Sequence, residues 1–261
     1  MDTLEVKEIW AYRDLLYFLV WRDVLVRYKQ TALGVAWALL QPLTSMVIFA
    51  VVFGRFAGLP SDGRPYPVFC YTGLILWTLF AQSVTMSANS LIVNEKLVTK
   101  IYFPRIIIPL SAIVACLPDF AIACTVSFIL FPYYGLGLPA NIWAAPLMIA
   151  LVLAAGAGTG LFLSAMNVTY RDFRYVVPFM IQIWMFASPV AYPAAIIPEG
   201  LRLVFALNPL AGAIEGFRWA LLGTPPNPWP MVAVSAAAAM TILFLGLVFF
   251  QRSQDEFADI I

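Results

Sequence analysis

Long runs without a charged residue constrain this chain more than any other feature. Such runs cover residues 30–54, 65–94, 142–166 and 231–250, and the run 106–131 contains one charge, Asp119. A helix needs about 20 apolar residues to cross a hydrocarbon core of ~30 Å. With a further apolar stretch that begins near Tyr175, these runs predict an all-α integral membrane protein with six transmembrane helices.

Composition excludes several functional classes. The chain is 62% hydrophobic and 11% charged, whereas a soluble domain is roughly 45–50% apolar and ~25% charged. A net charge of +1 without a basic run argues against nucleic acid as a partner. The chain has no histidine, the commonest general base and metal ligand, so we expect no metal site. Cys70, Cys116 and Cys124 fall inside predicted spans and are interpreted as packing residues.

Residues 1–29 are predicted to form an amphipathic interface helix. Apolar and aromatic residues, among them Trp10, Tyr17, Trp21 and Tyr28, recur at helical spacing, and most charges lie elsewhere. Such a helix fits best in the membrane interface, where membrane lipids are its partner. A helix packed on the cytosolic side of the protein itself would show the same pattern.

Lysine and arginine predict the orientation, because cytosolic loops carry an excess of both. With a cytosolic N-terminus, eleven of them fall inside (Lys7, Arg13, Arg22, Arg27, Lys29, Lys96, Lys100, Arg105, Arg171, Arg174, Arg252) and four outside (Arg55, Arg64, Arg202, Arg218). Six spans then place both termini in the cytosol.

The stretch 170–223 is apolar enough for a membrane, but it is broken by five prolines and by Arg202, Glu215 and Arg218. We predict that residues 191–223 form two short re-entrant external helices around Asn208 and Pro209. The alternative is a seventh span over 203–222, in which Glu215 and Arg218 pair at i, i+3. That span would move Arg252 and the acidic tail outside, so the re-entrant interpretation is preferred.

Four ordered motifs carry a family resemblance: RYKQTALGVAWALLQPL, NEKLVTKIYFPR, YRDFRYVVPF, and SPVAYP followed by LNPL. Over nearly the whole chain they resemble the ABC type-2 permeases that export bacterial polysaccharides, namely O-antigen, capsule and teichoic acid exporters. The resemblance implies one permease domain over 1–261, with spans one to five in 30–190, an external gate in 191–223, span six in 230–251 and a cytosolic tail in 252–261. It also implies a location in the bacterial inner membrane.

The resemblance further implies a homodimer bound to two copies of a separate ABC ATPase, which exports a lipid-diphosphate-linked polysaccharide. O-antigen is the favoured substrate, and capsular polysaccharide or teichoic acid is the alternative. The chain has no GxxxxGK[ST] loop, so we expect no enzymatic activity and no cofactor here, with ATP and Mg bound by the ATPase. A secondary transporter would show matching broken helices in both halves, and a membrane transferase would show clustered carboxylates or histidines. Neither pattern occurs in the chain.

Site residues are predicted on the same basis. The substrate pathway is assigned to spans one and five, through Trp37, Gln41, Phe179, Gln182, Phe186 and Tyr192. Contacts with lipid headgroups are assigned to Arg27 and Lys29, and coupling to the ATPase to Glu95, Lys96 and Lys100. The external gate is assigned to Asn208, Pro209, Glu215 and Arg218.

Two further features favour structure over chemistry. Asp119 could be part of a proton relay, because an intramembrane acid suggests function. It has no histidine or lysine nearby in the sequence, so a structural or interface role is favoured. Gly156 and Gly160 form a GxxxG motif, and Ser235 with Ala236 to Ala239 gives span six a face of small residues; both patterns predict close helix packing.

Overall fold

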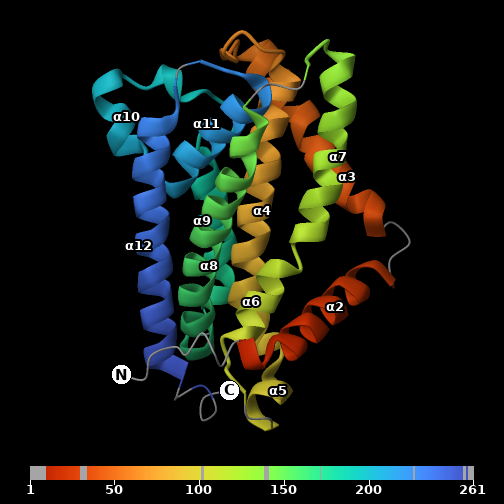
Figure 1. Ribbon diagram of the computed structural model, residues 1–261, viewed down its shortest axis with the longest axis vertical. Coiled ribbons are helices and arrows are strands. Elements are labelled where there is room, and N and C mark those ends of the chain that lie inside the picture. The colour runs from red at the N-terminus through yellow and green to blue at the C-terminus, as the bar shows by residue number, and fades with distance from the viewer. Residues whose placement is uncertain are drawn as a thin grey trace.

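The computed structural model describes residues 10–29, 34–100, 103–137, 141–170, 172–225, 227–254 and 257. Every regular element within these ranges is helical. The longer helices run side by side in an elongated bundle, with α5 (Glu95–Lys100) at one end and α10 (Glu199–Phe205) at the other (Figure 1). The all-helical prediction is therefore confirmed.

Five segments among the described residues are long and apolar enough to cross a membrane. They match the predicted spans one, two, three, four and six. In order they are Ala36–Phe56, Tyr66–Val93, Ile107–Tyr133, Ile142–Thr169 and Trp229–Ser253. Their elements are α3 (Gly34–Phe49) with η1 (Ala50–Phe56), α4 (Tyr66–Val93), α6 (Ile107–Val114) with α7 (Leu117–Tyr133), η2 (Ile142–Ala144) with α8 (Ala145–Thr169), and α12 (Trp229–Ser253).

The predicted fifth span is shorter than the others. Helix α9 (Phe173–Phe186) has 14 residues, which is about 21 Å of helix. An irregular segment with one short 3-10 turn, η3 (Ala194–Ile196), follows it. The chain then forms α10 and α11 (Pro209–Leu222) on either side of Asn208. The break is confirmed at the predicted residues, while the sixth crossing and the re-entrant depth stay predictions.

Proline explains where many of these helices begin. Its missing N–H costs nothing in the first turn of a helix, where backbone donors have no helical partner. Five helices carry proline there: α4, α7, α8, α11 and α12. Pro118 lies in the first turn of α7, just after the break between α6 and α7 at Ala115 and Cys116. Proline thus marks the start of these five helices, whereas Pro42, Pro132 and Pro178 lie inside α3, α7 and α9.

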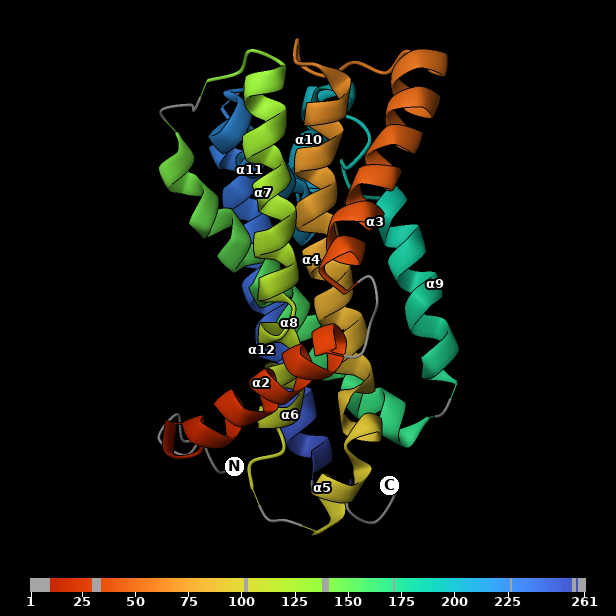
Figure 2. The same cartoon turned by 90° about the vertical axis from the view of Figure 1, so that its right-hand side faces the viewer.

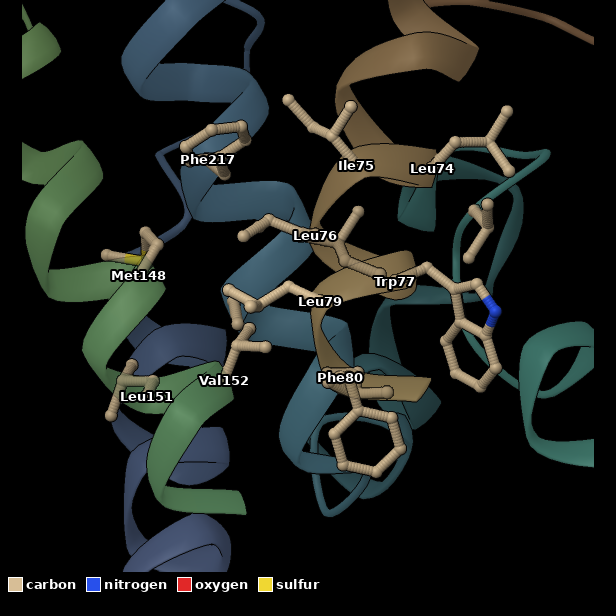
Figure 3. Packing of buried hydrophobic residues seen from close by; sticks show 14 of the residues in the cluster. Leu74, Ile75, Leu76, Trp77, Leu79, Phe80, Met148, Leu151, Val152 and Phe217 are labelled. Atoms are coloured by element: carbon tan, nitrogen blue, oxygen red, sulfur yellow. The ribbon is translucent and has the colours of Figure 1, made fainter. Parts of the chain in front are cut away.

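Helix α4 lies at the centre of the main apolar core. Its residues Leu76 and Leu79 face Val152 of α8, and Ile75 lies beside Phe217 of α11 (Figure 3). Of its most apolar 18-residue stretch, 78% is buried, against 67% for the fourth span. The three cysteines are unpaired, and Cys70 and Cys116 are buried in this core, as predicted.

Glycines allow α8 to approach two neighbours closely. A Cβ at Gly156 or Gly160 would lie 3.2 Å or 2.6 Å from the Cβ of Ser83 or Ser87 in α4. On the opposite side, a Cβ at Gly158 would lie 2.5 Å from the backbone of Leu243 in α12. The GxxxG prediction of close packing is confirmed, and Gly158 adds a second contact surface to the same helix.

Helix α2 (Arg13–Lys29) crosses the lower part of the bundle obliquely (Figures 1 and 2). Leu19 is buried in a second apolar cluster with residues of α6. The opposite face exposes Tyr17, Phe18 and Trp21. Helix α2 therefore packs on the protein itself through one face. Its other face exposes aromatic residues, so its location in the membrane interface stays a prediction.

The crossing of α8 and α12 provides a stability test. A Cβ at Gly246 would lie 2.1 Å from the carbonyl oxygen of Gly158, so Gly246→Ala should force the helices apart. Overpacking of this kind costs about 1–3 kcal/mol, and we expect a lower midpoint of thermal unfolding in detergent. Gly200→Ala in α10 is the control, because a Cβ there meets nothing within 4 Å. Equal midpoints for the two variants would contradict the close crossing.

Candidate functional site

Asn208 joins the ends of α9 and α11. Its Oδ1 accepts hydrogen bonds from Trp184 Nε1 at 3.0 Å and from the backbone N–H of Leu210 at 3.1 Å. Its Nδ2 donates to the carbonyl of Ala187 at 3.0 Å and to Ser188 Oγ at 2.9 Å. The amide thereby makes four bonds, two as acceptor and two as donor, and it caps α11.

Ser235 of α12 attaches the same turn to the bundle. Its hydroxyl accepts from the backbone N–H of Gly212 at 2.9 Å and shares its one proton between the carbonyls of Ala206 at 2.8 Å and Asn208 at 3.1 Å. Ser235 is fully buried. Sequence patterning identified only a small residue here, whereas the hydroxyl bonds the residues between α10 and α11.

Arg218 is the largest fully buried side chain of the described residues. Its Nε donates to the carbonyl of Phe69 at 3.2 Å, and its guanidinium carbon lies 3.7 Å from the centre of the Phe69 ring. Nη2 donates to the carbonyl of Val190 at 2.6 Å, and Nη1 to that of Tyr192 at 3.4 Å. The guanidinium thus bonds α11 to α4 and to the segment after α9.

Glu215 balances this buried charge one turn earlier in α11. Its Oε1 lies 3.1 Å from Arg218 Nη1 and accepts the backbone N–H of Ala194 at 2.9 Å. The i, i+3 pair that was considered for a seventh span is therefore present, inside a helix of 14 residues. We call Asn208, Glu215, Arg218 and Ser235, with their bonded partners, the outer clasp.

The outer clasp satisfies backbone groups that no helix satisfies. Irregular backbone at membrane depth must find partners within the protein. The carbonyls of Val190 and Tyr192 and the N–H of Ala194 find them in Arg218 and Glu215. Gly73 of α4 leaves room for the guanidinium of Arg218, since a Cβ at Gly73 would lie 2.7 Å from Arg218 Nη2.

Asp62 extends the charge pattern into the loop before α4. Burial raises the pKa of its carboxyl group, and the positive charge of Arg218 opposes that rise. The residue adopts a positive φ of 51°, a left-handed conformation in which aspartate is tolerated better than most residues. Arg218 therefore acts electrostatically on two acidic side chains, Glu215 inside the outer clasp and Asp62 outside it.

The predicted pathway residues lie mainly on one uncovered flank. Helices α3 and α9 run along the same side of the bundle in Figure 2, and only 11% of the most apolar stretch of the first span is buried. Exposed side chains there are Trp37, Gln41, Phe179, Gln182 and Phe186. Tyr192 differs, because it is half-buried and its hydroxyl donates to the carbonyl of Phe186 at 3.0 Å.

Helix α12 is also poorly covered, at 22% buried, but its outward chemistry differs. Met240, Phe244 and Leu245 are exposed, and the hydroxyl of nearby Thr241 is bonded to the carbonyl of Ala237 at 2.8 Å. An apolar face of this kind suits lipid. The flank of α3 and α9 exposes two side-chain amides among its aromatics, which suits a polar molecule with apolar faces.

A second polar cluster lies at Asp119, near the middle of the third span. Asp119, in the first turn of α7, accepts from Arg27 at one carboxylate oxygen and from the Tyr28 hydroxyl at the other. Arg27 also donates to the carbonyl of Ala115 at 3.4 Å. The favoured structural role of Asp119 gains support, and Arg27 has a protein partner that sequence reasoning missed. Lys29 is exposed beside it.

The predicted coupling residues lie at the extreme lower end. Glu95 and Lys96 are exposed on α5, which projects below the rest of the bundle (Figure 1). Val98 of the same helix is buried in the second apolar cluster, the one that contains Leu19. One side of α5 is therefore packed against the protein. The side chain of Lys100 lies outside the described residues.

Comparison with known proteins identifies the family. The profile of the ABC-2 type transporter family matches residues 14–222, from the first turn of α2 to the end of α11. The chain belongs to the ABC-2 type transporter family.

Relatives of this ABC-2 type transporter match along almost their whole length. The O-antigen export system permease protein RfbA of Myxococcus xanthus is 29% identical over 97% of this chain and 98% of the relative. A protein of the same name from Klebsiella pneumoniae is 28% identical over 95% of both. The polysialic acid transport protein KpsM of Escherichia coli is 24% identical over 90% of this chain and 91% of the relative.

The buried ion pair of this ABC-2 type transporter can be tested against an exposed one. Glu215→Gln keeps the shape but removes the counter-charge of Arg218, and breaking a buried pair costs about 3–5 kcal/mol. We expect a large loss of unfolding free energy in detergent. Glu199→Gln is the matched control, because Glu199 and Arg202 form an i, i+3 pair at 3.7 Å on the surface, where such pairs contribute little. Similar losses in both variants would contradict a stabilising role for the outer clasp.

Proposed function

We propose that this chain is the channel-forming permease subunit of an ATP-driven exporter of lipid-linked polysaccharide, with O-antigen as the favoured cargo. The observation that carries the proposal is full-length similarity to permeases named for O-antigen export. Similarity to polysialic acid transport proteins supports a polysaccharide even if the polymer is capsular. Teichoic acid stays an alternative for the same mechanism.

The exposed flank supports a homodimer. Helix α3 buries little of its surface within its own chain, and the flank that it shares with α9 combines aromatic rings with the amides of Gln41 and Gln182. Two copies that met at this flank would enclose these side chains. A sugar polymer presents hydroxyl groups and apolar ring faces, so amides and aromatics can contact it weakly enough for sliding.

The topology that we propose has six crossings and cytosolic termini. Helix α9 and the irregular segment after it together form the fifth crossing. Helices α10 and α11 enter from the outer side and return to it, as the external gate. The outer clasp supports this arrangement, because it gives partners to backbone groups of the segment between α9 and α10. Helix α2 then lies at the cytosolic interface of the bacterial inner membrane.

In the mechanism that follows, the polymer enters at the cytosolic side on its lipid diphosphate carrier, near Arg27 and Lys29. Two ABC ATPase subunits bind the lower ends of the permeases at α5 and hold the ATP and Mg. Movement of α5 parts the flanks of α3 and α9, and the polymer passes between them. The gate at Asn208, Pro209, Glu215 and Arg218 opens outward and closes behind it.

Co-purification tests the proposal as a whole. The tagged permease, expressed with the genes that neighbour its own, should bring down an ABC ATPase, and the complex should hydrolyse ATP in lipid nanodiscs. Deletion of the permease should abolish surface polysaccharide while the polymer accumulates inside the cell. Normal surface polysaccharide in the deletion strain would contradict the function.

Helix α5 allows a coupling test. Reversal of both exposed charges, Glu95→Lys with Lys96→Glu, should leave the fold intact and lower export at least about tenfold while the ATPase continues to hydrolyse ATP. The physical reason is that a mismatch of like charges at a docked interface costs binding free energy, and 1.4 kcal/mol is a tenfold change. Surface polysaccharide and ATP hydrolysis are measured in parallel. Wild-type export would remove α5 from the coupling contact.

A further inference from the structure

The cluster at Asp119 has the chemistry of an anion site already occupied by an anion. A guanidinium and a phenol hydroxyl, from the consecutive residues Arg27 and Tyr28, are both directed at the two oxygens of one carboxylate. Arginine binds carboxylates and phosphates through the same planar set of N–H donors. The same two side chains can therefore hold a phosphate oxygen in place of the carboxylate.

The cluster can be reached from the α2 side. The Arg27 side chain is 26% exposed, whereas that of Asp119 is 11% exposed. Lys29, two residues further along α2, is exposed and adds positive charge on the approach. A phosphate group that approaches along α2 thus meets the cations first and the carboxylate behind them.

Asp119 also lines a small cavity that is mostly apolar but has a few polar residues in its wall. Its volume of about 20 Å³ is enough for a single water molecule. Besides Asp119, its polar lining residues are Gln41, Thr78 and Gln82. Amide and hydroxyl groups can donate hydrogen bonds to a carboxylate, so a displaced Asp119 side chain would find new partners there.

We propose that Asp119 is an internal competitor for the substrate at Arg27 and Tyr28. Without substrate, the carboxylate occupies both donors and holds the last turn of α2 against α7. The diphosphate of the lipid carrier displaces it, and the carboxylate turns to the cavity that Gln41 of α3 also lines. Occupation of the entrance is thereby transmitted to a pathway helix. The proposal rests on the proposed function and adds the regulation of its entrance.

Binding measurements test the proposal, because it predicts the direction in which Asp119→Asn changes the affinity for a lipid diphosphate. The full-length permease is placed in phosphatidylcholine nanodiscs, and undecaprenyl diphosphate is titrated in. Asp119→Asn removes the competitor, so we expect tighter binding than in the wild type. If the carboxylate occupies the donors about nine-tenths of the time, the apparent Kd falls about tenfold. Arg27→Gln should weaken binding at least about tenfold. A merely structural Asp119 would give unchanged or weaker binding in Asp119→Asn, which would overturn the proposal.

A second variant acts without removing the ion pair. Gln82→Met keeps the length of the side chain but removes a donor from the cavity that receives the displaced carboxylate. It should weaken diphosphate binding several-fold, because the displaced carboxylate loses a hydrogen-bond partner. Unchanged binding in Gln82→Met would overturn the exchange even if Asp119→Asn failed to fold. Asp172→Asn, at an exposed acid before α9, controls for the change in net charge and should bind as the wild type does.

The same titration, repeated with a competing lipid, identifies the source of the phosphate. Phosphatidylglycerol should compete far more weakly than undecaprenyl diphosphate, and equal competition would overturn the assignment to the carrier. If the wild type binds the diphosphate but Asp119→Asn does not bind it more tightly, the exchange alone is overturned and the proposed function stands. Absence of diphosphate binding in the wild type would overturn both the exchange and the carrier entrance.

Discussion

The half of the structure that contains α10 and α11 depends on the buried guanidinium of Arg218. A charge without water must find a counter-charge and hydrogen-bond acceptors, and this one finds them on α11, on α4 and on the segment that follows α9. Two of its acceptors, the carbonyls of Val190 and Tyr192, belong to the irregular segment and have no helical partner. The cation and the broken backbone therefore stabilise one another, and a proline-rich, irregular segment becomes compatible with an apolar bundle.

The ion pairs of Arg218 and of Arg27 join different kinds of element. Arg218 and Glu215 lie on one helix and hold an adjacent irregular segment. Arg27 and Asp119 join an oblique helix to a bent span. Their environments also differ, because Arg218 is completely buried while Arg27 keeps a quarter of its side chain exposed. The first arrangement suits a rigid attachment, and the second suits a contact that a competing anion can reach.

Sequence alone predicted the features that depend on composition along the chain. The apolar runs located five spans, the prolines located the break around Asn208, and the small residues located the close approach of α8. It did not predict contacts that depend on register between distant helices. Nothing in the spacing of Arg27 and Asp119 indicates that they meet, because the rotation of each helix decides it. The contacts of the Ser235 hydroxyl were also missed. Small residues in a membrane helix usually indicate packing alone, and the sequence does not show which groups a serine hydroxyl meets.

The proposed homodimer would meet at the uncovered flank of α3 and α9. Photocrosslinking tests this most directly. p-Benzoylphenylalanine is placed at Phe179 of α9 or at Phe244 of α12, two phenylalanines with the same exposed fraction of 64%. We predict a crosslinked dimer from Phe179 in native membranes and none from Phe244. Crosslinking from Phe244 with none from Phe179 would contradict a pathway built on α3 and α9.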